Sequence, residues 1–261
     1  MRIALHGATG RMGKEVARLV QEKREGQIVG AIAASDAPEQ GADLGEVAGI
    51  GHLGVSVTAD HAVGLLGADV VIDFSTAGAI EMLARAVKRA RVALVSGTTG
   101  IDSSGAAALS DAAEVAPVLW APNMSLGVEA LARMARMAVA ALGEDYDIEI
   151  VETHHRHKVD APSGTALRLA EAVREARPNL TLLHGREGRP GPRKPNELMV
   201  VAMRGGDVVG DHTIHLMGPS ERIEITHRAT GRDLFARGAL RAAAWLIGKK
   251  PGRYVLADLL G

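Results

Sequence analysis

Apolar positions in the first half of the chain follow two alternating spacings. Short, nearly continuous apolar runs occur at residues 3–5, 28–34, 68–73, 92–95 and 118–120. Between these runs, apolar residues recur at helical spacing or in apolar-rich segments, which predicts helices at residues 14–23, 80–89 and 103–113. Buried strands that alternate with helices are typical of a parallel sheet covered on both faces. The pattern therefore predicts a doubly wound α/β domain.

The pattern changes after residue 122. Long helical spacing predicts helices at residues 126–142, 165–175 and 234–246. Alternating apolar positions predict half-buried strands at residues 147–152, 198–202, 208–210, 212–216 and 222–227. These elements indicate a second, α+β domain with a mixed sheet. We expect residues 35–54 to be irregular and residues 185–195, rich in Pro, Gly and Arg, to form a mobile loop.

Composition narrows the class of protein. The 261 residues are 47% hydrophobic and 23% charged, which is typical of one or two globular domains and not of a disordered chain. A formal net charge of -1 and 2% aromatic residues give no general attraction to nucleic acid or to an anionic membrane. Without cysteine there are no disulfides, thiolate metal sites or cysteine nucleophiles, which fits a cytoplasmic protein. We expect no signal peptide and no membrane span.

A glycine-rich loop joins the first predicted strand to the first helix. Its sequence is Gly7-Ala8-Thr9-Gly10-Arg11-Met12-Gly13, with Thr9 where the usual dinucleotide pattern has its second glycine. The pyrophosphate of a dinucleotide would rest on the N-terminus of the helix that follows. A plain βα turn rich in glycine is the alternative. Its place in the strand–turn–helix unit favours a Rossmann-type dinucleotide-binding domain.

Other predicted strands of this sheet also end in loops with small, hydroxyl or amide side chains. Residues 73–76, 96–100 and 121–125 form these loops, and ligands of open α/β sheets bind beyond the carboxyl ends of the strands. Turns and helix caps would use the same residue types, but three such loops at one edge favour contact with a nicotinamide and its ribose. The second strand ends in Ala34-Ser35, with Asp36 just beyond, and Arg11 is the nearest positive charge. These residues favour neither NAD nor NADP.

Residues 152–167 contain many polar and charged side chains. Three histidines, Arg156 and Lys158 follow a predicted strand, and Ser163-Gly164-Thr165 begins a helix. Lys158 beside a helix N-terminus predicts a binding site for a carboxylate, and a neighbouring imidazole can bind a second acid group or move a proton. A metal site is disfavoured because the interleaved Arg156 and Lys158 repel a cation. A solvated basic loop is the other alternative.

Two further sets of residues are expected to be structural. Met134 and Met137, at helical spacing, are predicted to pack in the core or in an interface. Hydrogen-bonded structural roles are predicted for His212, His215 and His227, which lie in or next to strands.

Several motifs together resemble the 4-hydroxy-tetrahydrodipicolinate reductase family, formerly called dihydrodipicolinate reductase. The resemblance covers essentially the whole chain, and the motifs that carry it lie at residues 7–13, 97–100, 152–166, 204–213 and 221–229. It implies NAD(P)H-dependent reduction of a cyclic imine dicarboxylate to tetrahydrodipicolinate in diaminopimelate and lysine biosynthesis. It also implies a cytoplasmic homotetramer, whose two domains close on the substrate.

The resemblance further implies a role for individual residues. By position, His154 is similar to the family's acid/base residue and Lys158 to its proton donor. The implied substrate-binding residues are His155, Lys158, Ser163, Gly164, Thr165 and Thr99. The implied cofactor-binding residues are Gly7, Ala8, Thr9, Gly10, Arg11, Met12, Gly97, Thr98, Thr99, Ala121, Pro122, Asn123 and Met124, with Ala34, Ser35 and Asp36 after the second strand. No metal is implied.

The family pattern also suggests domain limits and one departure. The implied dinucleotide-binding domain comprises residues 1–125 and 234–261, and the implied substrate-binding and oligomerisation domain comprises residues 126–233. Family members often have an acid and then a base after the second strand, where this chain has Ala34-Ser35. The preference between NADH and NADPH therefore stays open.

Two rival functions are compatible with the motifs. One is a related dehydrogenase that acts on another small keto or imino acid. The other is a non-catalytic dinucleotide sensor. Lys158, His154 and His155 argue against the sensor, because a sensor needs no proton donor beside an anion-binding site.

Overall fold

The computed structural model describes residues 1–261, which divide into two compact units. The first unit comprises Met1–Met124 and Asp233–Gly261, and the second comprises Ser125–Arg232. The first unit is therefore discontinuous in sequence. No helix in the structure is both long enough and apolar enough to cross a bilayer.

The first unit contains a seven-stranded sheet in which every pair of neighbouring strands is parallel. In the order β12-β6-β5-β4-β1-β2-β3, the chain runs from β1 outward to β2 and β3 on one side and to β4, β5 and β6 on the other. This order confirms the predicted doubly wound fold and makes β1 and β4 the switch point, where such sheets bind ligands. The strands are β1 (Arg2–His6), β2 (Gln27–Ile32), β3 (Val57–Thr58), β4 (Val70–Asp73), β5 (Ala93–Ser96), β6 (Pro117–Trp120) and β12 (Gly252–Tyr254).

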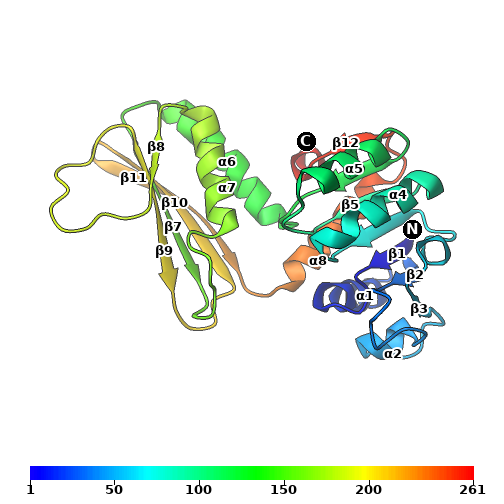
Figure 1. Ribbon diagram of the computed structural model, residues 1–261. Helices are drawn as coiled ribbons and strands as arrows, with labels where there is room; N and C mark the ends of the chain where they lie inside the picture. The colour runs from blue at the N-terminus through cyan, green and yellow to red at the C-terminus, as the bar shows by residue number, and fades with distance from the viewer. The chain divides into compact units, whose positions relative to one another are not determined.

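Helices cover both faces of this sheet (Figure 1). On one face lie α1 (Arg11–Lys23) and α8 (Asp233–Leu246), and on the other lie α4 (Ile80–Ala90) and α5 (Ser103–Ala113). Each long helix buries an apolar stripe against the strands, such as Val16, Leu19 and Val20 of α1. The shorter elements are α2 (Leu44–Ala48), α3 (His61–Gly64), η1 (Ala77–Ala79) and η2 (Leu256–Leu260).

The second unit is a five-stranded mixed sheet with two helices on one face, which confirms the predicted α+β class (Figure 1). Its strand order is β11-β10-β7-β9-β8, in which β10 is antiparallel to β7 and β11 while β9 is parallel to β7 and β8. The core lies between the sheet and α6 and α7. The elements are α6 (Leu126–Leu142), β7 (Asp147–His154), α7 (Gly164–Ala176), β8 (Thr181–Leu183), β9 (Glu197–Arg204), β10 (Gly210–Gly218) and β11 (Glu221–Ala229).

The side chains of β7 alternate between the two faces of the sheet, and its buried polar side chains lie on the helix side. Ile148, Ile150, Glu152 and His154 are the buried positions of the strand. The first two belong to the apolar core with α6 and α7. Side chains two residues apart on a strand share a face. Glu152 and His154 therefore lie on the same face as Ile148 and Ile150, and they form the polar end of this buried row.

Several local expectations differ from the structure. Residues 208 and 209 are not a strand but precede β10, and the stretch 35–54 contains α2. Asp43 organises that stretch, because its carboxylate accepts hydrogen bonds from four backbone N–H groups, which lower its pKa to about 2. Met134 and Met137 are 48% and 65% exposed on α6, so they do not pack in the core, and the alternative that they pack in an interface stays a prediction.

Candidate active site

The backbone of the glycine loop is packed so closely that two of its glycines leave no room for a side chain. Gly7 has a φ of +72°, and a Cβ there would lie 2.6 Å from the carbonyl oxygen of Phe74. A Cβ on Gly13 would lie 2.4 Å from the carbonyl oxygen of Gly7. Gly10 is the N-cap of α1 without a side-chain cap, and the first turn of α1 contains no acidic residue. The start of α1 is therefore suited to a phosphate.

A buried carboxylate joins the carboxyl ends of three strands next to this loop. Asp73, at the end of β4, accepts hydrogen bonds from His6 Nδ1 at 2.8 Å, Ser96 Oγ at 2.6 Å and Thr98 Oγ1 at 2.8 Å. Its Oδ1 also accepts the Ser75 N–H at 3.0 Å. Burial alone would raise the pKa of Asp73, but the hydrogen bonds from His6 and the serines hold it below its ordinary value. The network fixes the loop that begins at residue 97.

The predicted cofactor residues all lie on loops or helix starts of the first unit. The indole Nε1 of Trp120 donates to the carbonyl oxygen of Thr98 at 2.9 Å, which ties residues 97–100 to the end of β6. Thr99 is exposed, whereas Thr98 is buried. Ala34, Ser35 and Asp36 are exposed after β2, and the carbonyl of Ala34 accepts the side-chain amide of Gln40 at 2.7 Å.

In the second unit, Glu152 is the centre of a buried polar cluster. Its carboxylate is bonded to His154 Nδ1 and accepts two hydrogen bonds from Arg204, at 3.0 and 2.9 Å. It also accepts the backbone N–H of Ser163 at 3.0 Å. Burial would raise the pKa of Glu152, but the bonds from Arg204 and His154 keep it below its ordinary value. A charged Glu152 fixes the orientation and tautomer of His154.

The start of α7 lies beside this cluster. Ser163 is the N-cap, its Oγ accepts the N–H of Ala166 at 3.1 Å, and only 2% of the residue is exposed. The Oγ also lies 3.3 Å from Nε2 of His212. Gly164 is exposed, and nothing lies within 4 Å of a Cβ built there. The polar groups of Ser163 are thus used inside the protein, whereas Gly164 opens the helix at the surface.

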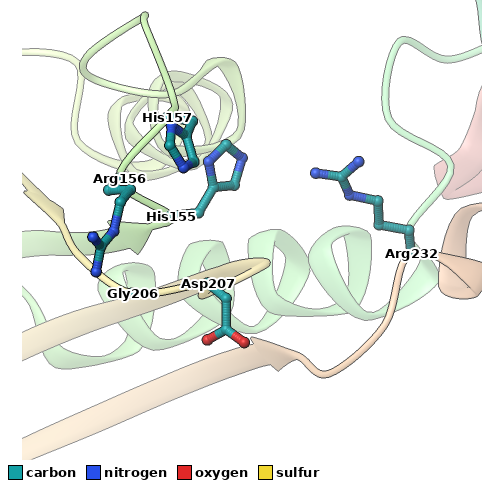
Figure 2. Close-up of a pocket in the computed structure, with 6 residues that line it drawn as sticks. All are labelled: His155, Arg156, His157, Gly206, Asp207 and Arg232. Atoms are coloured by element: carbon teal, nitrogen blue, oxygen red, sulfur yellow. The ribbon is translucent and has the colours of Figure 1, made fainter.

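Residues 155–160 form a loop that borders a cavity of about 670 Å³ (Figure 2). His155 and His157 lie on one side and Arg232 on the other, and the lining residues are His155, Arg156, His157, Gly206, Asp207 and Arg232. Burial and then the positive charge of Arg232 lower the pKa of His155. The Nζ of Lys158 pairs with Asp160, at 2.7 and 3.0 Å from its two oxygens.

The structure thus joins part of the predicted substrate set. His154 and Ser163 share Glu152, and Arg204 extends the cluster by donating to the carbonyl oxygen of Asp160 at 2.7 Å. His155 borders the cavity, while Lys158 is held on the loop by Asp160. Thr99 is the one predicted substrate residue in the first unit. The roles of these residues stay predictions.

Comparison with known proteins places the whole chain in one family. Residues 1–124 match the family model for the N-terminus of dihydrodipicolinate reductase, and residues 127–260 match the model for its C-terminus. This chain belongs to the dihydrodipicolinate reductase family. The finding confirms the resemblance that the sequence motifs indicated.

Members of the reductase family from several bacteria are similar over their full length. A 4-hydroxy-tetrahydrodipicolinate reductase of Anaeromyxobacter dehalogenans is 48% identical over 263 residues, covering 100% of this chain and 97% of the relative. The one of Myxococcus xanthus is 44% identical over 265 residues, covering 100% and 98%.

Solved structures have the same fold as this reductase family member. A dipicolinate-bound dihydrodipicolinate reductase from Paenisporosarcina sp. TG-14 has a TM-score of 0.79 at 22% identity, covering 98% of this chain and 97% of that chain. A scyllo-inositol dehydrogenase of Lactobacillus casei, with bound NAD(H) and scyllo-inositol, has a TM-score of 0.58 at 16% identity, covering 95% and 88%.

Sequence reasoning missed the charged groups that support the dihydrodipicolinate reductase motifs. Glu152 and Arg204 begin two of the motifs that carry the resemblance, but they lie 52 positions apart and the sequence assigned neither a role. Both fall at core-facing positions of neighbouring strands. A charged residue in the buried phase of a strand is the signal that could have found them. Arg232 gave no such signal, because it lies between a strand and a helix.

Proposed function

We propose that this chain catalyses the nicotinamide-dependent reduction of 4-hydroxy-tetrahydrodipicolinate to tetrahydrodipicolinate. In the overall balance, the substrate takes up a hydride and a proton and releases water. The observation that carries the proposal is the buried pair of Glu152 and His154 beside the start of α7, in a chain of the dihydrodipicolinate reductase family.

The first unit is proposed to bind NADH or NADPH. The open N-terminus of α1, the positive φ of Gly7 and the absence of acid in the first turn all suit a pyrophosphate. A bound nicotinamide supplies the hydride. Residues 7–12, 97–99 and 121–124 would hold the cofactor. The hydrogen bonds that the buried Asp73 accepts from Ser96 and Thr98 orient the second of these loops. Ala34 and Ser35 offer neither acid nor base to distinguish the two cofactors.

Proton handling is assigned to His154 and Lys158. With Glu152 accepting from Nδ1, His154 is left with Nε2 as the atom that gains or loses a proton. A Cβ on Gly210 would come within 2.9 Å of that Nε2, so the missing side chain keeps the ring's outer edge uncrowded. The ammonium of Lys158, steadied by Asp160, is the proposed proton donor.

Two positively polarised sites are available for the two carboxylates of the substrate. Gly164 and Thr165 begin α7, where the helix dipole favours an anion, and Lys158 precedes them on the loop. His155, at the cavity that Arg232 also lines, is proposed to bind the second carboxylate. Ser163 contributes by shaping the helix start, since its own donors bond inward.

The second unit is also proposed to assemble the cytoplasmic homotetramer that the family resemblance implies. Its sheet has helices on one face only (Figure 1), and Val201 and Met203, 36% and 52% exposed, lie on the other face of β9. An uncovered apolar strip of this kind is suited to contact with a second copy.

The test is oxidation of NADH and of NADPH, measured side by side with freshly generated 4-hydroxy-tetrahydrodipicolinate. Lys158→Ala should reduce kcat about 100-fold or more while leaving the Kd for cofactor unchanged. Lys194→Ala, on an exposed loop, is the matched control. Unchanged kcat in Lys158→Ala would refute the assigned role.

The same assay separates the rival functions. Tight dinucleotide binding without turnover of any imino acid would indicate a sensor. Turnover of another small acid that pyridine-2,6-dicarboxylate does not inhibit would indicate a different dehydrogenase.

A further inference from the structure

His212 lies in a row of three imidazoles on the helix side of the second sheet. Its ring is 5.2 Å from that of His154 on β7, nearly perpendicular to it at 77°, and 6.5 Å from that of His227 on β11. Only 3% of His212 is exposed. The residue therefore adjoins both the proposed acid/base histidine and the start of α7, although it lies on a different strand.

A hydrogen bond joins His212 to the serine that caps α7. The Ser163 Oγ accepts the N–H of Ala166 and lies 3.3 Å from His212 Nε2. A hydroxyl has one proton and two lone pairs, so Ser163 bonds to Nε2 in either tautomer of a neutral His212. Helix α7 is thus capped by a serine whose rotation His212 restricts.

A purely structural role accounts poorly for an imidazole at this position. Nδ1 of His212 is buried without a hydrogen-bond partner, whereas Ile214 and Leu216, the next core-facing residues of β10, are apolar. An unpartnered buried polar atom costs about 1–3 kcal/mol, and an apolar side chain would avoid that cost. The retained nitrogen that does form a bond is the one directed at Ser163.

We propose that His212 is a positioning residue, which holds the Ser163 hydroxyl and thereby keeps the start of α7 in the geometry that receives a substrate carboxylate. The proposal rests on the proposed function, because it assigns the helix start to the substrate.

The surroundings of His212 keep it uncharged. Burial lowers its pKa to about 4, the charges of His154, His227 and Lys158 act in the same direction, and Glu152 opposes them. At neutral pH His212 is therefore uncharged, and its Nε2 bonds to Ser163 as part of a neutral imidazole. His154 differs from His212 in that its Nδ1 is bonded to the carboxylate of Glu152.

The experiment compares His212→Leu, which removes the ring nitrogen bonded to Ser163, with His212→Gln, whose terminal amide can replace Nε2 as donor or acceptor. We expect His212→Leu to raise the KM for substrate and the Kd for pyridine-2,6-dicarboxylate about tenfold, with a smaller change in kcat, and His212→Gln to stay within about threefold of wild type. His227→Leu is the matched control, since it replaces a similar partly buried histidine that has no bond to α7.

Further variants keep the test informative if His212→Leu does not fold. His212→Asn places its amide near Nδ1, short of Ser163, so it should behave like the leucine variant. Ser163→Ala should raise KM similarly, and combining it with His212→Asn should add little. Equal KM values in all variants, or a glutamine variant as impaired as the asparagine one, would overturn the proposal. Absence of turnover in the wild type would instead refute the proposed function, while the dicarboxylate Kd would still test His212.

Discussion

Arg204 donates two hydrogen bonds to the carboxylate of Glu152, from Nη1 to Oε2 at 3.0 Å and from Nη2 to Oε1 at 2.9 Å. The carboxylate is completely buried, and the guanidinium side chain is 20% exposed. The pair joins β9 to β7 at the end of the strand that carries His154. The charge that Arg204 stabilises is also the one bonded to His154, so under the proposed function the pair would support the acid/base residue as well as the fold.

Glu152→Gln should weaken both functions of this pair. Removing one partner leaves the guanidinium without its counter-charge in a largely buried position, so we expect the free energy of unfolding to fall by about 3 kcal/mol. We also expect kcat to fall at least tenfold, because an amide stabilises a protonated His154 less well than a carboxylate does. Urea denaturation and steady-state kinetics measure the two effects. Glu171→Gln, on the exposed side of α7, should stay within about 0.5 kcal/mol of wild type.

The lowered pKa of the buried Asp73 predicts that the free energy of unfolding of the first unit falls at acid pH. Its pKa in the folded protein lies below the unfolded value, so the carboxylate stabilises the fold above that unfolded value, near 3.8. The contribution is lost as the pH falls through the folded pKa. We expect the free energy of unfolding of the first unit to decline below about pH 4.

Asp73→Asn isolates that contribution. An amide cannot accept all the hydrogen bonds from His6, Ser96 and Thr98, so the variant should be less stable at neutral pH by about 1–3 kcal/mol, with a flatter acid limb. Urea denaturation at a series of pH values is the measurement. The exposed Asp36→Asn should retain the wild-type slope, and an equally steep slope in Asp73→Asn would contradict the assignment.

Periodicity was sufficient to predict most of the fold. Helix α6 was predicted at residues 126–142 and spans Leu126–Leu142, because Ser125 caps its start and Gly143 follows its end. The two-residue β3 and three-residue β12 were missed, since strands this short contain too few positions for a period. Residues 35–54 looked irregular because their order depends on one carboxylate, Asp43, rather than on an apolar pattern.

The sequence pointed to candidate site residues only where they are consecutive. His154, Lys158 and the start of α7 fall within one stretch, and the glycine loop within another. Asp73 and its partner His6 lie 67 positions apart, and they meet only because β1 and β4 pair in register. Such pairs depend on strand order and register, which no local pattern specifies.

Gly7 provides a test of the cofactor loop. Gly7→Ala combines an unfavourable positive φ with a Cβ that would lie 2.6 Å from the Phe74 carbonyl oxygen, a backbone atom that cannot move aside alone. We expect the Kd for NADH or NADPH to rise more than tenfold and the stability of the first unit to fall by more than about 2 kcal/mol. Gly41→Ala has a similar φ, +81°, but no atom within 4 Å of the new Cβ. It should cost about 1 kcal/mol and leave cofactor binding intact. Equal effects of the two substitutions would show that strain alone acts at Gly7.

The proposed tetramer can be tested at Val201 and Met203, the exposed apolar residues on the face of the second sheet that no helix covers. Met203→Arg places a charge on β9, on the face opposite the one from which Arg204 reaches Glu152. If that face is buried between copies, the charge would be desolvated without a partner, and the assembly should dissociate. Light scattering coupled to size-exclusion chromatography measures the mass. Met82→Arg, at an exposed methionine of α4 in the first unit, should leave the mass at that of the wild type. Met137→Arg tests whether the exposed face of α6 is the interface instead. A wild-type mass in Met203→Arg and a reduced mass in Met137→Arg would move the interface from the sheet to that helix.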